Sequence, residues 1–129
     1  MNFLHILCVD DNPSLLLALK TSLEHYGCEV VTASDGMAAL TQFKARPDAF
    51  GAIVTDHDMP HMNGAELVRS VREVGFKGRI VVMSGRLTVK DLRAYQDYAI
   101  SGFFHKPFEV GLLATMLSQV DSDFDACGG

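Results

Sequence analysis

The sequence contains few cysteines, no long apolar segment and no excess of basic residues. Three cysteines among 129 residues form no close pair, which favours reduced thiols over a disulfide framework. No apolar run approaches the roughly 18 residues of a membrane-spanning helix. The apolar segment 3–9 is short and lacks the basic start of a signal peptide. These absences predict a cytoplasmic protein that does not act on a membrane.

The charge balance argues against nucleic acid as a direct partner. The formal net charge is −5, whereas phosphate binding needs a basic face. A chain of 129 residues with 48% hydrophobic and 21% charged residues is typical of one globular domain. No repeat, linker or low-complexity tract divides it. We therefore predict a single domain over residues 1–120 and a short, flexible, acidic tail over 121–129.

Short apolar segments rich in β-branched residues alternate five times with amphipathic ones. The apolar segments predict buried strands, at 4–9, 29–33, 52–55, 79–84 and 102–106. Strand–helix alternation with short connections is typical of parallel β/α units with helices on both faces of the sheet. The sequence therefore predicts an α/β fold with a doubly wound parallel sheet.

Helix start and stop signals stand between the predicted strands. Asn12-Pro13 and Asn63 are placed to cap the first and third helices, and Thr88 with Asp91 resembles a capping box that opens the fourth. Gly27 ends the first helix, and Pro47 follows the second. The predicted inward-facing residues are Leu15, Leu16, Leu19, Leu23 and Tyr26; Met37, Leu40 and Phe43; Leu67, Val68 and Val71; Leu92, Tyr95 and Tyr98; and Val110, Leu113, Met116, Leu117 and Val120.

Polar residues stand at the carboxyl ends of four of the predicted strands. They are Asp10 with Asp11, Asp56, Ser84 and Lys106. Parallel strands end at the same edge of a sheet, which is also where open α/β sheets bind ligands. Converging carboxylates repel one another, and Mg²⁺ relieves that repulsion by taking oxygen ligands. A lysine, a hydroxyl and a metal around a carboxylate nucleophile suit phosphoryl transfer.

The chain resembles the response-regulator receiver domains of two-component signalling, the CheY-like superfamily. The resemblance covers residues 4 to about 120 and rests on motifs in the family's order: Asp10-Asp11, Asp56-x-x-Met59-Pro60 with Gly64, Ser84-Gly85 and Lys106-Pro107-Phe108. It implies a flavodoxin-like fold with strand order 2-1-3-4-5 and five helices.

The resemblance also implies the chemistry of the strand ends. Asp56 would accept a phosphoryl group from a histidine kinase or a phosphotransfer protein. Ser84 and Lys106 would hold the phosphoryl oxygens, with a cis bond between Lys106 and Pro107 that aims the lysine. The domain would then be regulatory, catalysing only its own phosphorylation and autodephosphorylation.

A metal site follows from the same resemblance. Mg²⁺, or Mn²⁺ in its place, would be bound by Asp11, Asp56 and the backbone carbonyl of Asp58. Asp10 would act on the metal largely through water.

The resemblance also implies how phosphorylation would change the surface that a partner binds. Phosphorylation would draw Ser84 toward the phosphate and let Phe103 turn inward, changing the face made by 92–98, the fifth strand and 110–120. A downstream protein or a second copy would bind that face. Phe103 lacks a hydroxyl, so a family mechanism that relies on a tyrosine hydroxyl does not carry over.

Two rim charges are particular to this sequence. Asp58 follows the acceptor by two residues and Arg86 follows Ser84 by two. We expect them to flank the mouth of the site, within reach of each other. There they would limit the approach of the hydrolytic water and give a long-lived acyl phosphate.

Several alternatives remain open at this level. One is a phosphorylation-independent adaptor, a degenerate receiver. Another is a small phosphatase using Asp56-His57-Asp58, although the chain has no room for the cap domain of such enzymes. A flavin binder would need a hydroxyl- and glycine-rich loop after the first strand, and a zinc site at His57 and His61 is disfavoured by Pro60 between them. The chain can be a stand-alone regulator or a receiver from a longer regulator or hybrid kinase.

Overall fold

The computed structural model describes residues 4–117. Its sheet has five parallel strands in the order β2-β1-β3-β4-β5. The strands are β1 (His5–Val9), β2 (Glu29–Ala33), β3 (Ala52–Asp56), β4 (Arg79–Ser84) and β5 (Gly102–His105). The predicted doubly wound parallel fold, its strand order and its five helices are confirmed.

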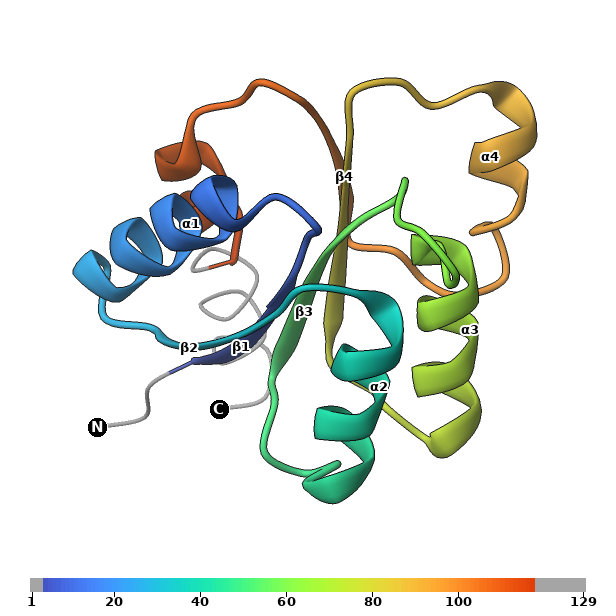
Figure 1. Ribbon diagram of the computed structural model, residues 1–129, viewed down its shortest axis with the longest axis horizontal. Coiled ribbons are helices and arrows are strands. Elements are labelled where there is room, and N and C mark those ends of the chain that lie inside the picture. The colour runs from blue at the N-terminus through green and yellow to red at the C-terminus, as the bar shows by residue number, and fades with distance from the viewer. Residues whose placement is uncertain (1–3, 118–129) are drawn as a thin grey trace, which may run out of the picture.

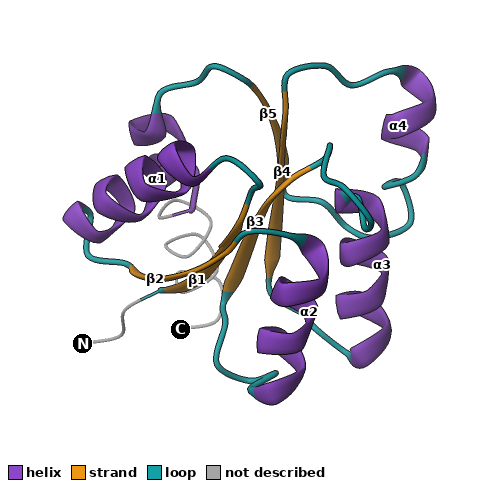
Figure 2. Ribbon diagram, in the orientation of Figure 1, coloured by secondary structure: helices purple, strands orange, loops and turns teal. Residues whose placement is uncertain are grey.

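Helices cover both faces of this sheet (Figure 1). One face carries α1 (Pro13–His25) and the C-terminal helix, described over residues 110–117. The other carries α2 (Gly36–Ala45), α3 (Gly64–Val74) and α4 (Val89–Arg93), as the colouring in Figure 2 also shows. None of the described helices is both long and apolar enough to cross a membrane.

The central strands contribute side chains to two separate cores. In β1, Ile6 and Cys8 point to the α1 side while Leu7 and Val9 point to the α2–α3 side, and all four are fully buried. Burial raises the pKa of the Cys8 thiol to about 12, so Cys8 is an inert core residue, as its place in an apolar strand predicts. A strand covered on both faces is therefore apolar on both sides along most of its length.

The predicted caps fix where helices begin, close behind the strand ends. The Asn12 side chain accepts hydrogen bonds from the backbone of Ser14 and Leu15, at 3.0 and 3.2 Å. Asn63 and Glu66 form a reciprocal capping box at the start of α3. These caps hold the loops that carry the strand-end polar residues.

The fourth helix is shorter than the periodicity predicts, and this part of the prediction was wrong. It ends at Arg93, and turns follow up to Tyr98. The guanidinium of Arg72 in α3 donates hydrogen bonds to the backbone carbonyls of Tyr98 and Ala99, at 2.9 and 3.0 Å. Ala99 has a left-handed backbone, with φ +53°. The bonds to Arg72 thus hold the chain after α4 in a non-helical path.

Three residues predicted to face the core are exposed, and one of them is Leu92, at 41%. Tyr26 caps the end of α1 and is 58% exposed, while Met37 in the first turn of α2 is 53% exposed. The buried faces of these helices are formed by Leu16, Leu19 and Leu23 in α1 and by Ala39, Leu40 and Phe43 in α2. The predicted core residue Val120 and the tail at 121–129 lie outside the described residues.

Candidate functional site

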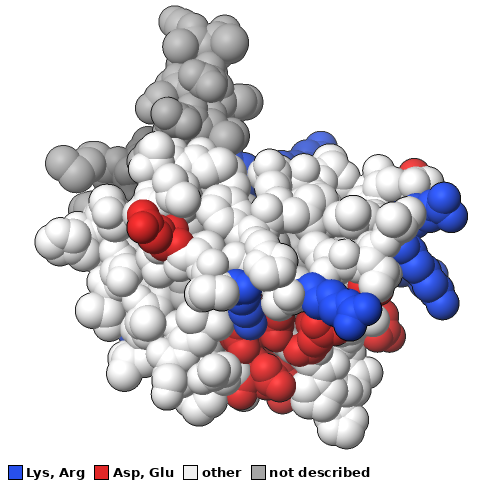
Figure 3. Space-filling model, turned by 90° about the horizontal axis from the view of Figure 1, so that it is seen from above, with Lys and Arg blue, Asp and Glu red and all other residues white. Residues whose placement is uncertain are grey.

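The strand-end polar residues meet at one edge of the sheet. Asp10 follows β1, Asp56 is the last residue of β3, Ser84 is the last residue of β4, and Lys106 follows β5. The backbone N–H of Lys106 donates to the carbonyl of Ser84 at 2.8 Å. Figure 3 looks down on this edge and shows acidic side chains gathered there with basic ones beside them. The parallel topology therefore brings together residues that are up to 96 positions apart.

Three carboxylates form a compact cluster at this edge. Oxygen atoms of Asp10, Asp11 and Asp56 all lie within 4.8 Å of one another. Asp10 and Asp56 are 1% and 4% exposed, whereas Asp11 is exposed. An all-oxygen donor set, partly buried and negatively charged, fits a hard divalent cation such as Mg²⁺ or Mn²⁺.

Lys106 partly neutralises the cluster. Its Nζ lies 2.7 Å from Asp10 Oδ2 and 3.2 Å from Asp56 Oδ1. Burial alone would lower the pKa of Lys106, but the hydrogen bond to Asp10 and the charges of both carboxylates outweigh it and raise the pKa above its usual value. The Lys106–Pro107 peptide bond is cis. The two contacts of Nζ hold the lysine as a cation beside Asp56.

Asp56 itself is held in an unfavourable environment for its charge. Burial, followed by the charge of Asp10, raises its pKa above the ordinary aspartate value, and Lys106 only partly offsets this. A carboxylate kept under electrostatic stress at a strand end is a mark of a functional site.

This stress predicts that Asp56→Asn stabilises the metal-free protein near neutral pH. Because the folded-state pKa is raised, the folded protein loses relative stability as the pH rises from the ordinary aspartate value of about 3.9 through the raised value. The asparagine variant does not have that loss. Its advantage over wild type in unfolding free energy should therefore shrink as the pH falls from the raised pKa toward about 3.9. Urea unfolding with a chelator, with Asp97→Asn in the exposed α4–β5 loop as control, measures it. A variant less stable than wild type at neutral pH would contradict the prediction.

The Ser84 hydroxyl is engaged by the loop that follows β4. It donates to the carbonyl of Arg86 at 2.8 Å and accepts from the Arg86 N–H at 3.0 Å. Asp58 Oδ2 lies 3.4 Å from the same hydroxyl. Among the described residues no ion pair joins Asp58 to Arg86. Asp58 therefore meets Ser84 with its carboxylate and Arg86 meets it with its backbone, and the expected bridge between the two charges is not formed.

Phe103 lies on the outer side of β5. Its side chain is 41% exposed, and its ring makes an edge contact with Tyr95 at a centroid distance of 5.5 Å. It is in an outward position, and it touches the segment that follows α4.

The sequence reasoning considered His57 only for phosphatase or zinc chemistry and missed its contacts within the fold. Its ring is 6% exposed and contacts Tyr95 and Asp91. His61, the other histidine of the zinc alternative, is exposed and has a left-handed backbone, with φ +69°. Within residues 4–117 the one cluster of metal-binding type is formed by the three aspartates and includes neither histidine. The sequence signal was a histidine directly after the acceptor, just beyond the end of a buried strand, rather than the spacing of two histidines.

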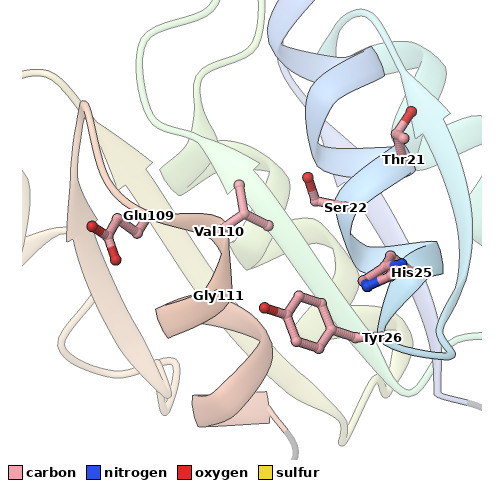
Figure 4. A pocket seen from close by; sticks show the side chains of 7 residues that line it. All are labelled: Thr21, Ser22, His25, Tyr26, Glu109, Val110 and Gly111. Atoms are coloured by element: carbon pink, nitrogen blue, oxygen red, sulfur yellow. The ribbon is translucent and has the colours of Figure 1, made fainter.

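A hollow in the surface lies away from the strand ends. It has a volume of about 580 Å³ and separates α1 from the start of the C-terminal helix, with Ser22, Tyr26 and Val110 among its walls (Figure 4). The hydroxyl of Tyr26 lies 3.1 Å from where a Cβ on Gly111 would stand. This hollow carries none of the clustered carboxylates, so the strand-end cluster is the candidate site.

Comparison with known proteins agrees with this geometry. The family model described as the response regulator receiver domain matches residues 6–118. Response regulator MprA of Mycobacterium avium is 36% identical over 115 residues, which are 88% of this chain and 49% of that protein. The peroxide stress-activated histidine kinase mak3 of Schizosaccharomyces pombe is 31% identical over 120 residues, 88% of this chain and 5% of that protein.

A solved structure extends the agreement to the fold. The chemotaxis protein CheY4 of Vibrio cholerae has a TM-score of 0.83 and 28% identity, over 92% of this chain and 99% of that one. The chain spans about half the length of the mycobacterial regulator and a small part of the kinase. With a match over nearly its whole length, the chain belongs to the response regulator receiver domains of two-component systems.

Proposed function

We propose that Asp56 is the phosphoacceptor of this receiver domain. The observation that carries the proposal is a buried carboxylate at the end of β3, 3.2 Å from Lys106 Nζ and within one cluster with two further aspartates. A carboxylate oxygen would bond to phosphorus as the N–P bond of a phosphohistidine donor breaks, giving an acyl phosphate and a free imidazole. Lys106 and Ser84 would hold the phosphoryl oxygens.

Receiver domains bind Mg²⁺ at an acidic pocket, and the three aspartates fit that role. We propose that Asp11 and Asp56 hold the ion with the backbone carbonyl of Asp58, and that Asp10 acts through water. The ion would supply positive charge to the transferring phosphoryl group. Lys106 orients that group from the side of β5, and Asn12 N–H holds Asp10 Oδ1 at 2.9 Å.

The output is a change on the face formed by α4, β5 and the C-terminal helix. Phosphate on Asp56 would attract the Ser84 hydroxyl away from Arg86 by a charge-assisted hydrogen bond. Phe103 would then turn inward. The exposed apolar side chains of Val89 and Leu92 lie on the same side, where a downstream protein or a second copy would bind.

Labelling with acetyl phosphate separates this proposal from its rivals. We expect intact-mass analysis to show one phosphoryl adduct that requires Mg²⁺ and disappears with chelator. No adduct would favour a phosphorylation-independent adaptor. Steady turnover of added phosphomonoesters would favour a small phosphatase.

The rim residues predict a slow loss of the phosphoryl group. Asp58 and Arg86 are exposed and border Ser84, Asp58 through its carboxylate and Arg86 through its backbone, and an in-line water would approach the phosphoryl group past them. Exposed charges contribute at most about 1 kcal/mol to stability even when they are paired, so the effect of Asp58 and Arg86 should be on access. We expect the Asp58→Ala, Arg86→Ala double variant to dephosphorylate severalfold faster than wild type, as followed by the decay of the adduct mass. Equal lifetimes would show that the two charges have no such role.

The cognate partners are a histidine kinase or a phosphotransfer protein. The relatives include a histidine kinase and a response regulator that are longer than this chain. The receiver function proposed for residues 4–117 is compatible with either setting.

A further inference from the structure

The side chain of His57 connects the strand that carries Asp56 to the segment around α4. Its backbone is anchored twice: its N–H donates to the carbonyl of Met83 at 2.8 Å, and its carbonyl accepts from Gly64 N–H at 2.9 Å. The ring is 6% exposed. The backbone that carries the imidazole is therefore held in place directly beside Asp56.

Both ring nitrogens have partners. Nδ1 lies 2.5 Å from the Tyr95 hydroxyl, and Nε2 lies 3.3 Å from Asp91 Oδ1. In a neutral imidazole one nitrogen donates and the other accepts. A carboxylate only accepts, so Nε2–H donates to Asp91 and the Tyr95 hydroxyl donates to Nδ1. Burial raises the pKa of Tyr95, which keeps this donor protonated.

The helix next to these contacts, α4, buries little of its own surface. No residue of α4 is buried, and Val89 and Leu92 are 67% and 41% exposed. Asp91 uses Oδ2 to accept from Thr88 N–H at 2.9 Å, which caps the helix, and Oδ1 to contact His57. Tyr95, just beyond the helix, is 1% exposed. His57 thus binds the start of α4 through Asp91 and the residues after it through Tyr95.

The groups that lie between the Tyr95 ring and the end of β3 are closely packed. A Cβ on Gly64 would stand 2.6 Å from the Asp56 carbonyl oxygen and 2.7 Å from the Tyr95 hydroxyl. Tyr95 also makes a ring contact with Phe103. A displacement at the end of β3 would therefore move Tyr95, and through it the α4–β5 surface, because close-packed groups transmit strain.

We propose that His57 is a positioning residue that holds α4 against the sheet and transmits the state of Asp56 to α4 through Asp91 and Tyr95. The holding role needs only the contacts above. The transmitting role rests on the proposed phosphorylation of Asp56.

Hydrogen exchange of the full chain, read by mass spectrometry, tests the holding role. His57→Phe keeps a ring of similar size and removes both hydrogen bonds, while Tyr95→Phe removes one and keeps the contact with Phe103. Losing one such bond should speed exchange of amides 88–95 about fivefold. Exchange in β1 and β3 should be unchanged, and His25→Phe, at the exposed end of α1, should match wild type.

Two further variants separate the contacts. The side-chain amide of His57→Asn can stand near Nδ1 and keep the bond to Tyr95, and that of His57→Gln can stand near Nε2 and keep the bond to Asp91. Both should fall between wild type and His57→Phe. Unchanged exchange at 88–95 in His57→Phe and Tyr95→Phe, or equal acceleration across the sheet, would overturn the holding role.

Adding acetyl phosphate with Mg²⁺ tests the transmitting role. Exchange at 88–95 should change in labelled wild type and should not change further in labelled His57→Phe. An equal change in both proteins, or none in labelled wild type, would overturn it. If wild type takes no label, the phosphorylation proposal fails and the transmitting role with it, while the comparison of unlabelled proteins still decides the holding role.

Discussion

Asp56→Asn should abolish the Mg²⁺-dependent phosphoryl adduct completely. The amide that replaces the carboxylate is neither a competent nucleophile at this edge nor an anionic metal ligand, so both the bond to phosphorus and the metal site are lost. Intact-mass analysis after acetyl phosphate treatment measures the loss. We expect no adduct above the level seen in wild type with chelator.

Neighbouring carboxylates provide matched controls. Asp58→Asn leaves Asp56 and its contact with Lys106 in place and should retain the adduct, because the predicted contribution of Asp58 to the metal comes from its backbone. Asp11→Asn should retain the acceptor but require more Mg²⁺, because it removes one ligand from the cluster. An adduct that survives Asp56→Asn would show that another residue is modified.

Arg72→Ala should cause the largest loss of stability among single substitutions outside the two cores. The guanidinium donates to four backbone carbonyls, at 2.8 to 3.0 Å; they belong to Phe76, Gly78, Tyr98 and Ala99. It also lies over the Phe76 ring, 5.5 Å from the centroid. Hydrogen bonds to a charged donor contribute about 1.5–3 kcal/mol each and are not additive, so we expect a loss of about 3–5 kcal/mol. Urea unfolding measures it.

Two variants sharpen this expectation. Arg72→Lys keeps the charge but not the planar fork that reaches several carbonyls at once, so it should recover only part of the loss. Arg69→Ala, on the same helix, removes an exposed pair with Glu73 and should leave the unfolding midpoint nearly unchanged. Equal effects of Arg72→Ala and Arg69→Ala would contradict the role assigned to Arg72.

The sequence alone determined the architecture and the central site. Strands covered on both faces are apolar along most of their length, so β1 and β3 were visible as apolar runs. Caps such as Asn12 and Asn63 are local, because the capping side chain and the amides it binds lie within three residues. The convergence of Asp10, Asp56 and Lys106 followed once the strands were parallel, since parallel strands end at the same edge.

Only the tertiary structure decided the surroundings of that site. The path of the chain after α4 is held by Arg72, whose bonds to Tyr98 and Ala99 span 26 and 27 positions. In the sequence Arg72 is merely a basic residue in the last turn of a helix, where it suits the helix dipole.

The link from Asp56 to α4 was also undetermined by sequence. His57 meets Tyr95 across 38 positions, and the contact exists only because Gly64 leaves room beside the Asp56 carbonyl. Periodicity and capping report interactions within a few residues of each other. The direction of a buried side chain between two elements is set by packing among all of them, and so it appeared only in the folded chain.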